Sequence, residues 1–235
     1  NPDTFFTHRE SCNNYYDAVP AIVEDYMNKV SEITGRKYGL FSYYGAADAE
    51  RVIIAMGSVT EAIRETIDHL TAQGEKVGLV AVHLYRPFSA KHFLAAVPAT
   101  AKTIAVLDRT KEPGANGEPL YLDVKECFYG KENAPVIVGG RYGLGSNDTT
   151  PAQILAVYEN LALPEPKNQF TLGIVDDVTF TSLPQKEEVA MGGEGMFEAK
   201  FYGLGADGTV GANKNSVKII GDNTNKHRQA YFSYD

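Results

Sequence analysis

Two alternating patterns of apolar residues organise the middle of the chain. Short continuous apolar runs have the length and composition of buried parallel strands, and they lie at residues 52–56, 77–82, 103–107 and 135–138. Apolar residues at helical spacing follow these runs, and they predict helices over residues 58–73, 89–97, 120–130 and 150–161. Strands that alternate with helices favour an α/β fold, a Rossmann-like open parallel sheet with helices on both faces.

Capping signals place several helix ends. A helix over residues 20–33 is expected to begin with Pro20 in its first turn and to end before Gly35. Ser58 and Glu61 have the spacing of a capping box, in which each side chain satisfies a backbone amide of the other residue. We therefore expect Ser58 to cap the helix that follows the first buried strand.

The flanks of the regular region carry weaker signals. Residues 38–44 predict a strand before it, and residues 170–175 predict a late strand after it. Residues 183–198 combine a proline, a charged run and two adjacent glycines, which favours a linker. We therefore expect a linker over these residues and a new segment of structure from Lys200 onward.

The strongest local motif is a GxGxxG sequence over residues 203–208. Glycines let the backbone approach a ligand closely, and the amides that open a following helix favour an anion such as a phosphate. Thr209, Asn213 or Lys214 would add hydrogen-bond donors. A tight strand-to-helix turn explains the same glycines without any ligand.

A nicotinamide dinucleotide site fits this motif poorly. That fingerprint needs a helix, a second strand and an acidic residue about twenty positions further on, where Asp222 stands. A strand at 217–220 would leave only eight residues after Gly208, too few for a crossover helix. One helix over 209–220, ended by Gly221, accounts better for the pattern.

Two further loops follow predicted strands at the sheet edge where α/β proteins bind ligands. Residues 107–117 contain Arg109, and residues 139–151 contain Arg141. Each arginine could bind an anion or contact a neighbouring domain. Local ion pairs in a solvated loop explain the first segment equally well. Capping of the next helix by Thr149 or Thr150 explains the second.

Composition excludes several functions. The 30 acidic and 22 basic side chains give a net charge of −8, which argues against a nucleic-acid partner. The chain contains no run of 18 apolar residues, so the sequence predicts no membrane span. Cys12 and Cys127 stand far apart, which favours reduced thiols over a disulfide, and the histidines form no zinc motif. A nucleophile elbow, a P-loop and an iron–sulfur cysteine cluster are all missing.

Six blocks of sequence together resemble the pyruvate:ferredoxin (flavodoxin) oxidoreductase family. They are YYDAVP at 15–20, AERVIIAMGS at 49–58, VHLYRPF at 82–88, LDRTKEPG at 107–114, GGRYGLGS at 139–146 and GADGTVGANK at 205–214. The blocks occur in the family's order and extend over nearly the whole chain.

The resemblance implies an activity and a set of cofactors. The family converts pyruvate and coenzyme A to acetyl-CoA and carbon dioxide and reduces ferredoxin or flavodoxin. Thiamine diphosphate, magnesium and [4Fe-4S] clusters serve that chemistry, and the resemblance places them outside this chain. It also implies a cytoplasmic homodimer, in which this chain is an internal fragment that contacts the other domains and is inactive alone.

The resemblance also assigns the parts of the fragment. Residues 1–190 would be domain II, which is similar to the C-terminal domain of transketolase. Residues 191–235 would be a linker and the truncated start of domain III, a second α/β segment that contributes to coenzyme A binding. Within the matching loop, the residues expected to meet coenzyme A are Asp207, Gly208, Thr209 and Val210, with Asn213 and Lys214 beside them.

Alternatives from other classes remain open at this stage. The resemblance supplies no catalytic or metal-binding residue for this chain. The chain could be a binding or docking module without chemistry, or a dinucleotide-binding dehydrogenase built on residues 203–208. A parent enzyme that uses another 2-oxoacid also fits, because the residues that select the substrate would lie outside the chain.

Overall fold

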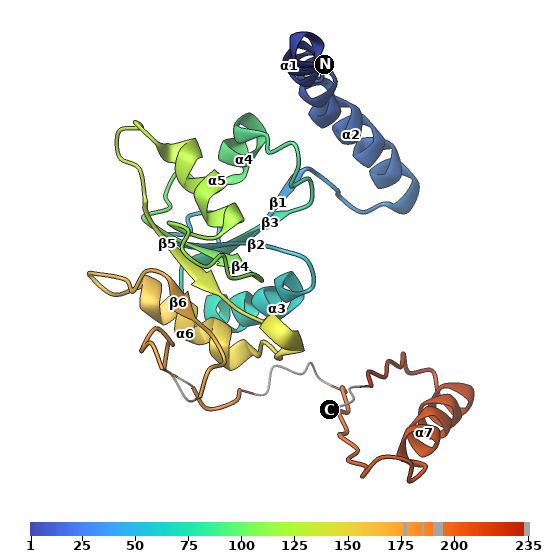
Figure 1. The fold of residues 1–235 in the computed structure, drawn as a ribbon. Helices are drawn as coiled ribbons and strands as arrows, with labels where there is room; N and C mark the ends of the chain where they lie inside the picture. The colour runs from blue at the N-terminus through green and yellow to red at the C-terminus, as the bar shows by residue number, and fades with distance from the viewer. Residues whose placement is uncertain (176–177, 185, 190–194, 233–235) are drawn as a thin grey trace. The chain divides into compact units, whose positions relative to one another are not determined.

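The computed structural model describes residues 1–175, 178–184, 186–189 and 195–232 (Figure 1). The chain divides into two compact units, Asn1–Met191 and Gly192–Asp235. The helices are α1 (Pro2–Ser11), α2 (Asn13–Thr34), α3 (Val59–Ala72), α4 (Ala90–Ala96), α5 (Pro119–Phe128), α6 (Pro151–Leu161) and α7 (Thr209–Asn223). The strands are β1 (Phe41–Gly45), β2 (Arg51–Met56), β3 (Val77–Val82), β4 (Thr103–Asp108), β5 (Val136–Arg141) and β6 (Phe170–Thr171).

A six-stranded sheet in the order β1-β3-β2-β4-β5-β6 forms the centre of the first unit. All neighbouring strands pair in parallel except β1, which pairs antiparallel with β3. β1 ends at Gly45 and β2 begins at Arg51, so the chain reverses over a connection too short for a parallel crossover. The predicted α/β open sheet is confirmed, with one antiparallel edge strand added.

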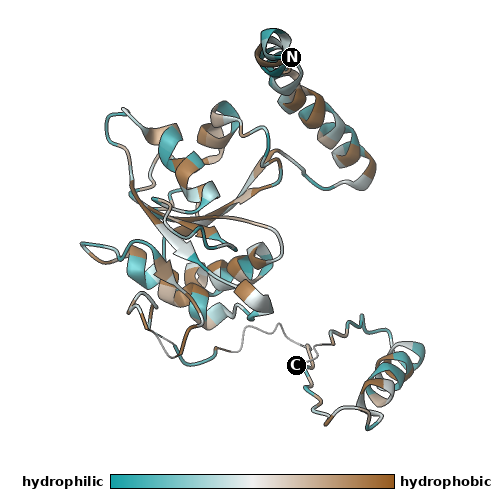
Figure 2. Ribbon diagram, viewed as in Figure 1, coloured by the Kyte–Doolittle hydropathy of each residue, from teal (hydrophilic) through white to brown (hydrophobic). Residues whose placement is uncertain are grey.

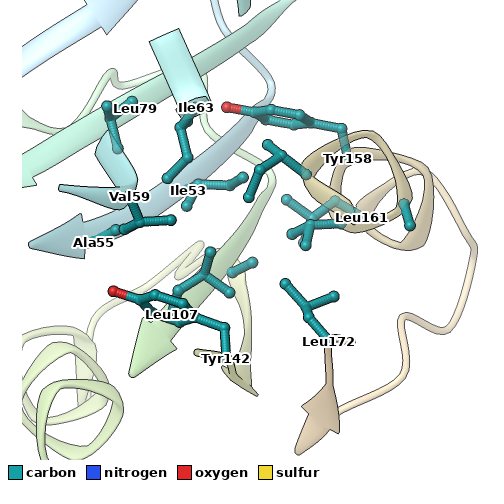
Figure 3. Close-up of a cluster of buried hydrophobic side chains, with 14 of the residues drawn as sticks. Ile53, Ala55, Val59, Ile63, Leu79, Leu107, Tyr142, Tyr158, Leu161 and Leu172 are labelled. Atoms are coloured by element: carbon teal, nitrogen blue, oxygen red, sulfur yellow. The ribbon is translucent and has the colours of Figure 1, made fainter. Parts of the chain in front are cut away.

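The apolar runs of the strands supply both faces of the sheet. Successive side chains of a strand point to opposite faces, so Ile53 and Ala55 join one core cluster while Val52 and Ile54 join the other. The first cluster packs α3 and α6 against the sheet (Figure 3). The second lies on the other side, with α4 and α5 (Figure 1). Burial on both faces explains why the strands are apolar throughout.

The helices of the first unit confirm most of the predicted pattern and correct two of its ends. α2 begins at Asn13, so Pro20 lies inside the helix and not in its first turn. Gly35 ends α2 in the left-handed conformation, as predicted. Ser58 makes no side-chain capping bond, so the predicted capping box is wrong. The Thr60 hydroxyl instead donates to the Gly57 carbonyl over 2.8 Å, which satisfies an acceptor beside the start of α3.

The last two strands differ in length from their predictions. β5 continues past residue 138 through two glycines to Arg141, and β6 is only two residues long. A Cβ on Gly139 would meet the Tyr121 ring at 3.0 Å, and a Cβ on Gly140 would overlap the ring of Phe170. Aromatic rings therefore occupy the space that side chains at these two positions would need.

The predicted linker contains no helix or strand among its described residues, 183–184, 186–189 and 195–198. The remaining linker residues, 185 and 190–194, lie outside the described part of the chain. No described helix is long and apolar enough to cross a membrane.

α7 is the single helix of the second unit within the described residues (Figure 1). Residues 217–220 are helical, which confirms one helix in place of the second strand that a dinucleotide fold requires. Gly221 does not end the helix, which continues through Asn223. A glycine in a helix costs only about 1 kcal/mol relative to alanine, so it does not by itself stop the helix.

Candidate functional site

Asp207 organises the glycine-rich loop that precedes α7. Its Oδ2 accepts a hydrogen bond from the backbone amide of Leu204, and its Oδ1 accepts one from the amide of Thr209, both over 2.9 Å. Gly205 and Gly208 adopt φ values of 86° and 85°, which side chains rarely tolerate. The motif therefore folds as a tight turn around one carboxylate.

Gly203 fits the same turn because it has no side chain. A Cβ there would lie 2.7 Å from the Thr209 hydroxyl and 2.9 Å from Asp207 Oδ1. Gly203 and Thr209, at the two ends of the turn, therefore lie in direct contact. Of the motif's three glycines, two are required by their positive φ and one by this close approach.

Two backbone amides at the start of α7 are available as hydrogen-bond donors. The amide of Thr209 is taken by Asp207, and the amide of Ala212 bonds to the Gly208 carbonyl. The amides of Val210 and Gly211 lie between them at the start of α7, where a helix provides no acceptor. Neither has an acceptor among the described residues. They can donate to a ligand.

Asp207 is held as a charged acceptor. The hydrogen bond from the Thr209 amide, followed by those from the Thr209 hydroxyl and the Leu204 amide, lowers the pKa of the Asp207 carboxyl. A carboxylate can accept further hydrogen bonds through its remaining lone pairs. The loop therefore offers a negative acceptor next to two free amide donors.

The structure brings four of the predicted residues together and separates the other two. Asp207, Gly208, Thr209 and Val210 form the turn and the first residues of α7. Asn213 and Lys214 lie one turn further along the helix. The ammonium of Lys214 lies 5.4 Å from the centre of the Phe232 ring, a cation–π contact within the same unit.

A second polar cluster lies at the carboxyl ends of β4 and β5 in the first unit. Asp108 ends β4, is almost fully buried, and accepts hydrogen bonds from the amides of Leu120 over 3.0 Å and Tyr121 over 3.1 Å. These amides open α5, so Asp108 caps that helix from a neighbouring strand. Burial raises the pKa of the Asp108 carboxyl above its ordinary value.

Arg141, which ends β5, and Arg109, which directly follows β4, both bind groups of the protein itself. The Arg141 guanidinium donates to the Gln169 carbonyl over 2.9 Å and lies 3.6 Å from the carboxylate of the buried Glu118. Arg109 donates from Nε to the Gly143 carbonyl over 2.9 Å. Both arginines therefore fasten loops at the sheet edge, which favours the interpretation as local ion pairs and hydrogen bonds.

Sequence reasoning missed the two acids of this cluster. Asp108 directly follows an apolar strand, and Glu118 precedes the proline that opens α5. The signals that could have revealed them were an acidic residue at the end of an apolar strand and another just before the start of a helix. Thr150 does cap α6 as predicted, because its side chain accepts a hydrogen bond from the amide of Gln153.

Other surfaces carry little chemistry. Cys12 and Cys127 are free thiols, and the described residues contain no group of three side chains that could hold a metal ion. A hollow of about 640 Å³ lies beside β1 and α3, lined by residues that include Tyr44, Asp48 and Asp68. Asp48 pairs with Lys76 over 2.6 Å, and Asp68 accepts from the Tyr44 hydroxyl over 2.6 Å. Its lining carboxylates are thus partnered within the protein.

Comparisons with known proteins give one consistent result. Residues 49–154 match the family model of pyruvate:ferredoxin oxidoreductase core domain II. A pyruvate-flavodoxin oxidoreductase from Klebsiella pneumoniae is 60% identical over 100% of this chain, and a pyruvate:ferredoxin oxidoreductase from Moorella thermoacetica is 57% identical. The chain spans only about 20% of the length of each relative.

Among solved structures, one match is a 2-oxoglutarate:ferredoxin oxidoreductase from Magnetococcus marinus with 2-oxoglutarate, coenzyme A and succinyl-CoA bound. It is 22% identical and covers 53% of this chain and 20% of its own, with a TM-score of 0.35. The close relatives and the domain match therefore agree. Over its whole length the chain is similar to about a fifth of these pyruvate-flavodoxin and pyruvate:ferredoxin oxidoreductases, and residues 49–154 match core domain II of that family.

Proposed function

We propose that the chain is part of an enzyme that converts pyruvate and coenzyme A to acetyl-CoA and carbon dioxide and passes electrons to ferredoxin or flavodoxin. The names of its close relatives support this reaction, because they are pyruvate-flavodoxin and pyruvate:ferredoxin oxidoreductases. We further infer a cytoplasmic homodimer, as the family resemblance implies. Residues 1–190 act as domain II and 191–235 as the linker and start of domain III.

The redox and decarboxylation chemistry would rest on groups held elsewhere in the longer polypeptide. A [4Fe-4S] cluster takes four thiolates, and this chain has two cysteines. The family resemblance places thiamine diphosphate and its magnesium outside this chain as well. It leaves domain II a role in packing and positioning.

The chain's own contribution to ligand binding is part of the coenzyme A site at residues 207–214. The observation that carries this proposal is the loop around Asp207, which places a charged acceptor beside the free amides of Val210 and Gly211. The negative charge of Asp207 opposes a phosphate at this point. It suits the neutral pantetheine arm, whose amide and hydroxyl groups can donate to a carboxylate while its carbonyl oxygens accept from free amides.

The test uses the full-length enzyme and measures KM for both substrates. Asp207→Ala and Thr209→Val are expected to raise KM for coenzyme A by about tenfold, which corresponds to about 1.4 kcal/mol. KM for pyruvate is expected to stay unchanged. Asn215→Ala, an exposed position on α7, is the matched control. Equal rises in both KM values would mean that the loop is structural and that the proposed site is wrong.

Calorimetric titration of the same full-length variants separates binding from turnover. Coenzyme A is expected to bind the unaltered enzyme and to bind Asp207→Ala more weakly, while NAD is expected to bind neither. Saturable binding of NAD would revive the dehydrogenase interpretation. The helical conformation of residues 217–220 argues against that outcome.

A further inference from the structure

The outer side of α2 carries a stripe of exposed apolar side chains. Tyr15, Ile22, Tyr26 and Ile33 recur at the spacing that places residues on one side of a helix, and Val30 adjoins them. We call these five residues the outer stripe. Their exposed fractions range from 45% for Val30 to 84% for Ile33. The stripe extends about 27 Å along the helix, at 1.5 Å per residue.

A different side of α2 already contacts the body of the first unit. Val23 and Met27 pack, partly buried, against the core cluster that includes Phe93. The Glu24 carboxylate lies 3.7 Å from the His92 ring, and the Ser31 hydroxyl accepts from the Tyr38 amide over 3.0 Å. The outer stripe is therefore a second apolar surface next to an inner one, and it stays exposed in the described chain. Figure 2 shows hydrophobic positions recurring along α2.

The composition of the stripe is typical of a protein interface. Tyrosines are enriched in the buried centres of interfaces, because they bury a large area and lose little side-chain entropy. Contiguous exposed apolar residues of this kind mark interaction sites in soluble proteins. The stripe contains two tyrosines and three aliphatic residues on adjacent turns.

The charges around the stripe exclude a lipid surface as its partner. α2 contains four acidic residues, Asp17, Glu24, Asp25 and Glu32, against one basic residue, Lys29. Amphipathic helices that bind membranes carry lysine and arginine on their polar side, which attract anionic lipids. An acidic helix would be repelled.

We propose that the outer stripe of α2 is an interdomain interface, covered by another part of the same, longer polypeptide. This proposal rests on the proposed function, because it requires the chain to be part of such a polypeptide. The curated relatives are about five times as long as this chain, so most of their length lies outside it. A domain in that remaining length would be covalently tethered to α2. It would therefore be present at a high effective concentration, and no second copy of the protein would be needed.

The test compares cysteine labelling at one stripe position in two forms of the protein. Cys12 and Cys127 are first replaced by serine, and Tyr26→Cys is then introduced into the 235-residue chain and into the full-length protein. Maleimide labelling of this cysteine is expected to be at least tenfold slower in the full-length protein. Asn28→Cys, on the polar side of α2, is the matched control and is expected to label at similar rates in both forms.

Two outcomes would overturn the proposal. Equal labelling of Tyr26→Cys in both forms would show that the stripe stays open in the longer protein. Slow labelling in the 235-residue chain that speeds up on dilution would identify a second copy as the partner. Neither readout depends on coenzyme A or on turnover, so failure here is distinct from failure of the proposed reaction.

A second variant keeps the test independent of labelling chemistry. Ile33→Asp is expected to lower the melting temperature of the full-length protein and to leave that of the 235-residue chain unchanged, because the side chain is 84% exposed there. Equal effects in both forms would contradict the interdomain interface.

Discussion

At the scale of single residues, Asp108 illustrates a charged side chain that serves the fold. It stands at the carboxyl end of β4, where α/β sheets commonly bind ligands. Both of its oxygens are occupied by amides of α5, and it is almost fully buried. The sequence could not reveal this role, because the capped amides lie twelve and thirteen positions away along the chain.

Replacing Asp108 by alanine is expected to lower the free energy of unfolding by about 1–3 kcal/mol, because two buried amides lose their acceptors. Equilibrium urea denaturation measures the change. Lys125→Ala, an exposed position on α5, is the control and should stay within about 0.5 kcal/mol of the unaltered chain. A loss no larger than that of the control would contradict the capping role.

The raised pKa of Asp108 predicts a pH dependence with a definite sign. Above the ordinary pKa of 3.8 the unfolded chain has released this proton while the folded protein still binds it. Stability due to this group therefore falls as pH rises from 3.8 to the folded pKa. Relative to Asp108→Asn, which does not titrate, the unaltered chain is expected to lose stability over that interval. If the unaltered chain instead gained stability relative to Asp108→Asn as pH rises, the prediction would be contradicted.

At the scale of elements, apolar periodicity predicted the helices and strands of the sheet but not all of their ends. Pro20 is a frequent first-turn residue, yet the helix extends back to Asn13 and Pro20 lies inside it. β5 was predicted to stop before its glycines because strands rarely contain them. The glycines are needed because the rings of Tyr121 and Phe170 pack directly on the strand.

This packing makes Gly140 a sensitive position. Gly140→Ala is expected to lower the free energy of unfolding by about 1–3 kcal/mol, because the new methyl group overlaps the buried Phe170 ring. Adding Phe170→Leu should recover part of the loss, so the two changes are not additive. Gly211→Ala, where a Cβ meets nothing within 4 Å, is the control. Additive losses in denaturation experiments would show that the ring is not the obstacle.

At the scale of the whole molecule, the family resemblance in the sequence anticipated the domain match and the full-length relatives. It did not reveal how unevenly the core is distributed. Within the described residues, the buried hydrophobic side chains lie between Leu40 and Leu183, all in the first unit. α7 has no buried residue. Whether a residue is buried depends on which other segments it contacts. A sequence motif such as residues 205–214 does not reveal whether those segments lie within this chain.

This distribution predicts that cooperative unfolding belongs to the first unit. A chain shortened to residues 1–191 is expected to melt within about 2 °C of the 235-residue chain, because it keeps every described buried hydrophobic side chain. Shortening to 1–180 removes Leu183 and the bridge between Thr171 and Ser182, and is expected to lower the melting temperature by several degrees. Calorimetry distinguishes these outcomes. If the 1–191 chain melts more than about 4 °C lower, the second unit contributes about 1 kcal/mol or more to stability, which would contradict the prediction.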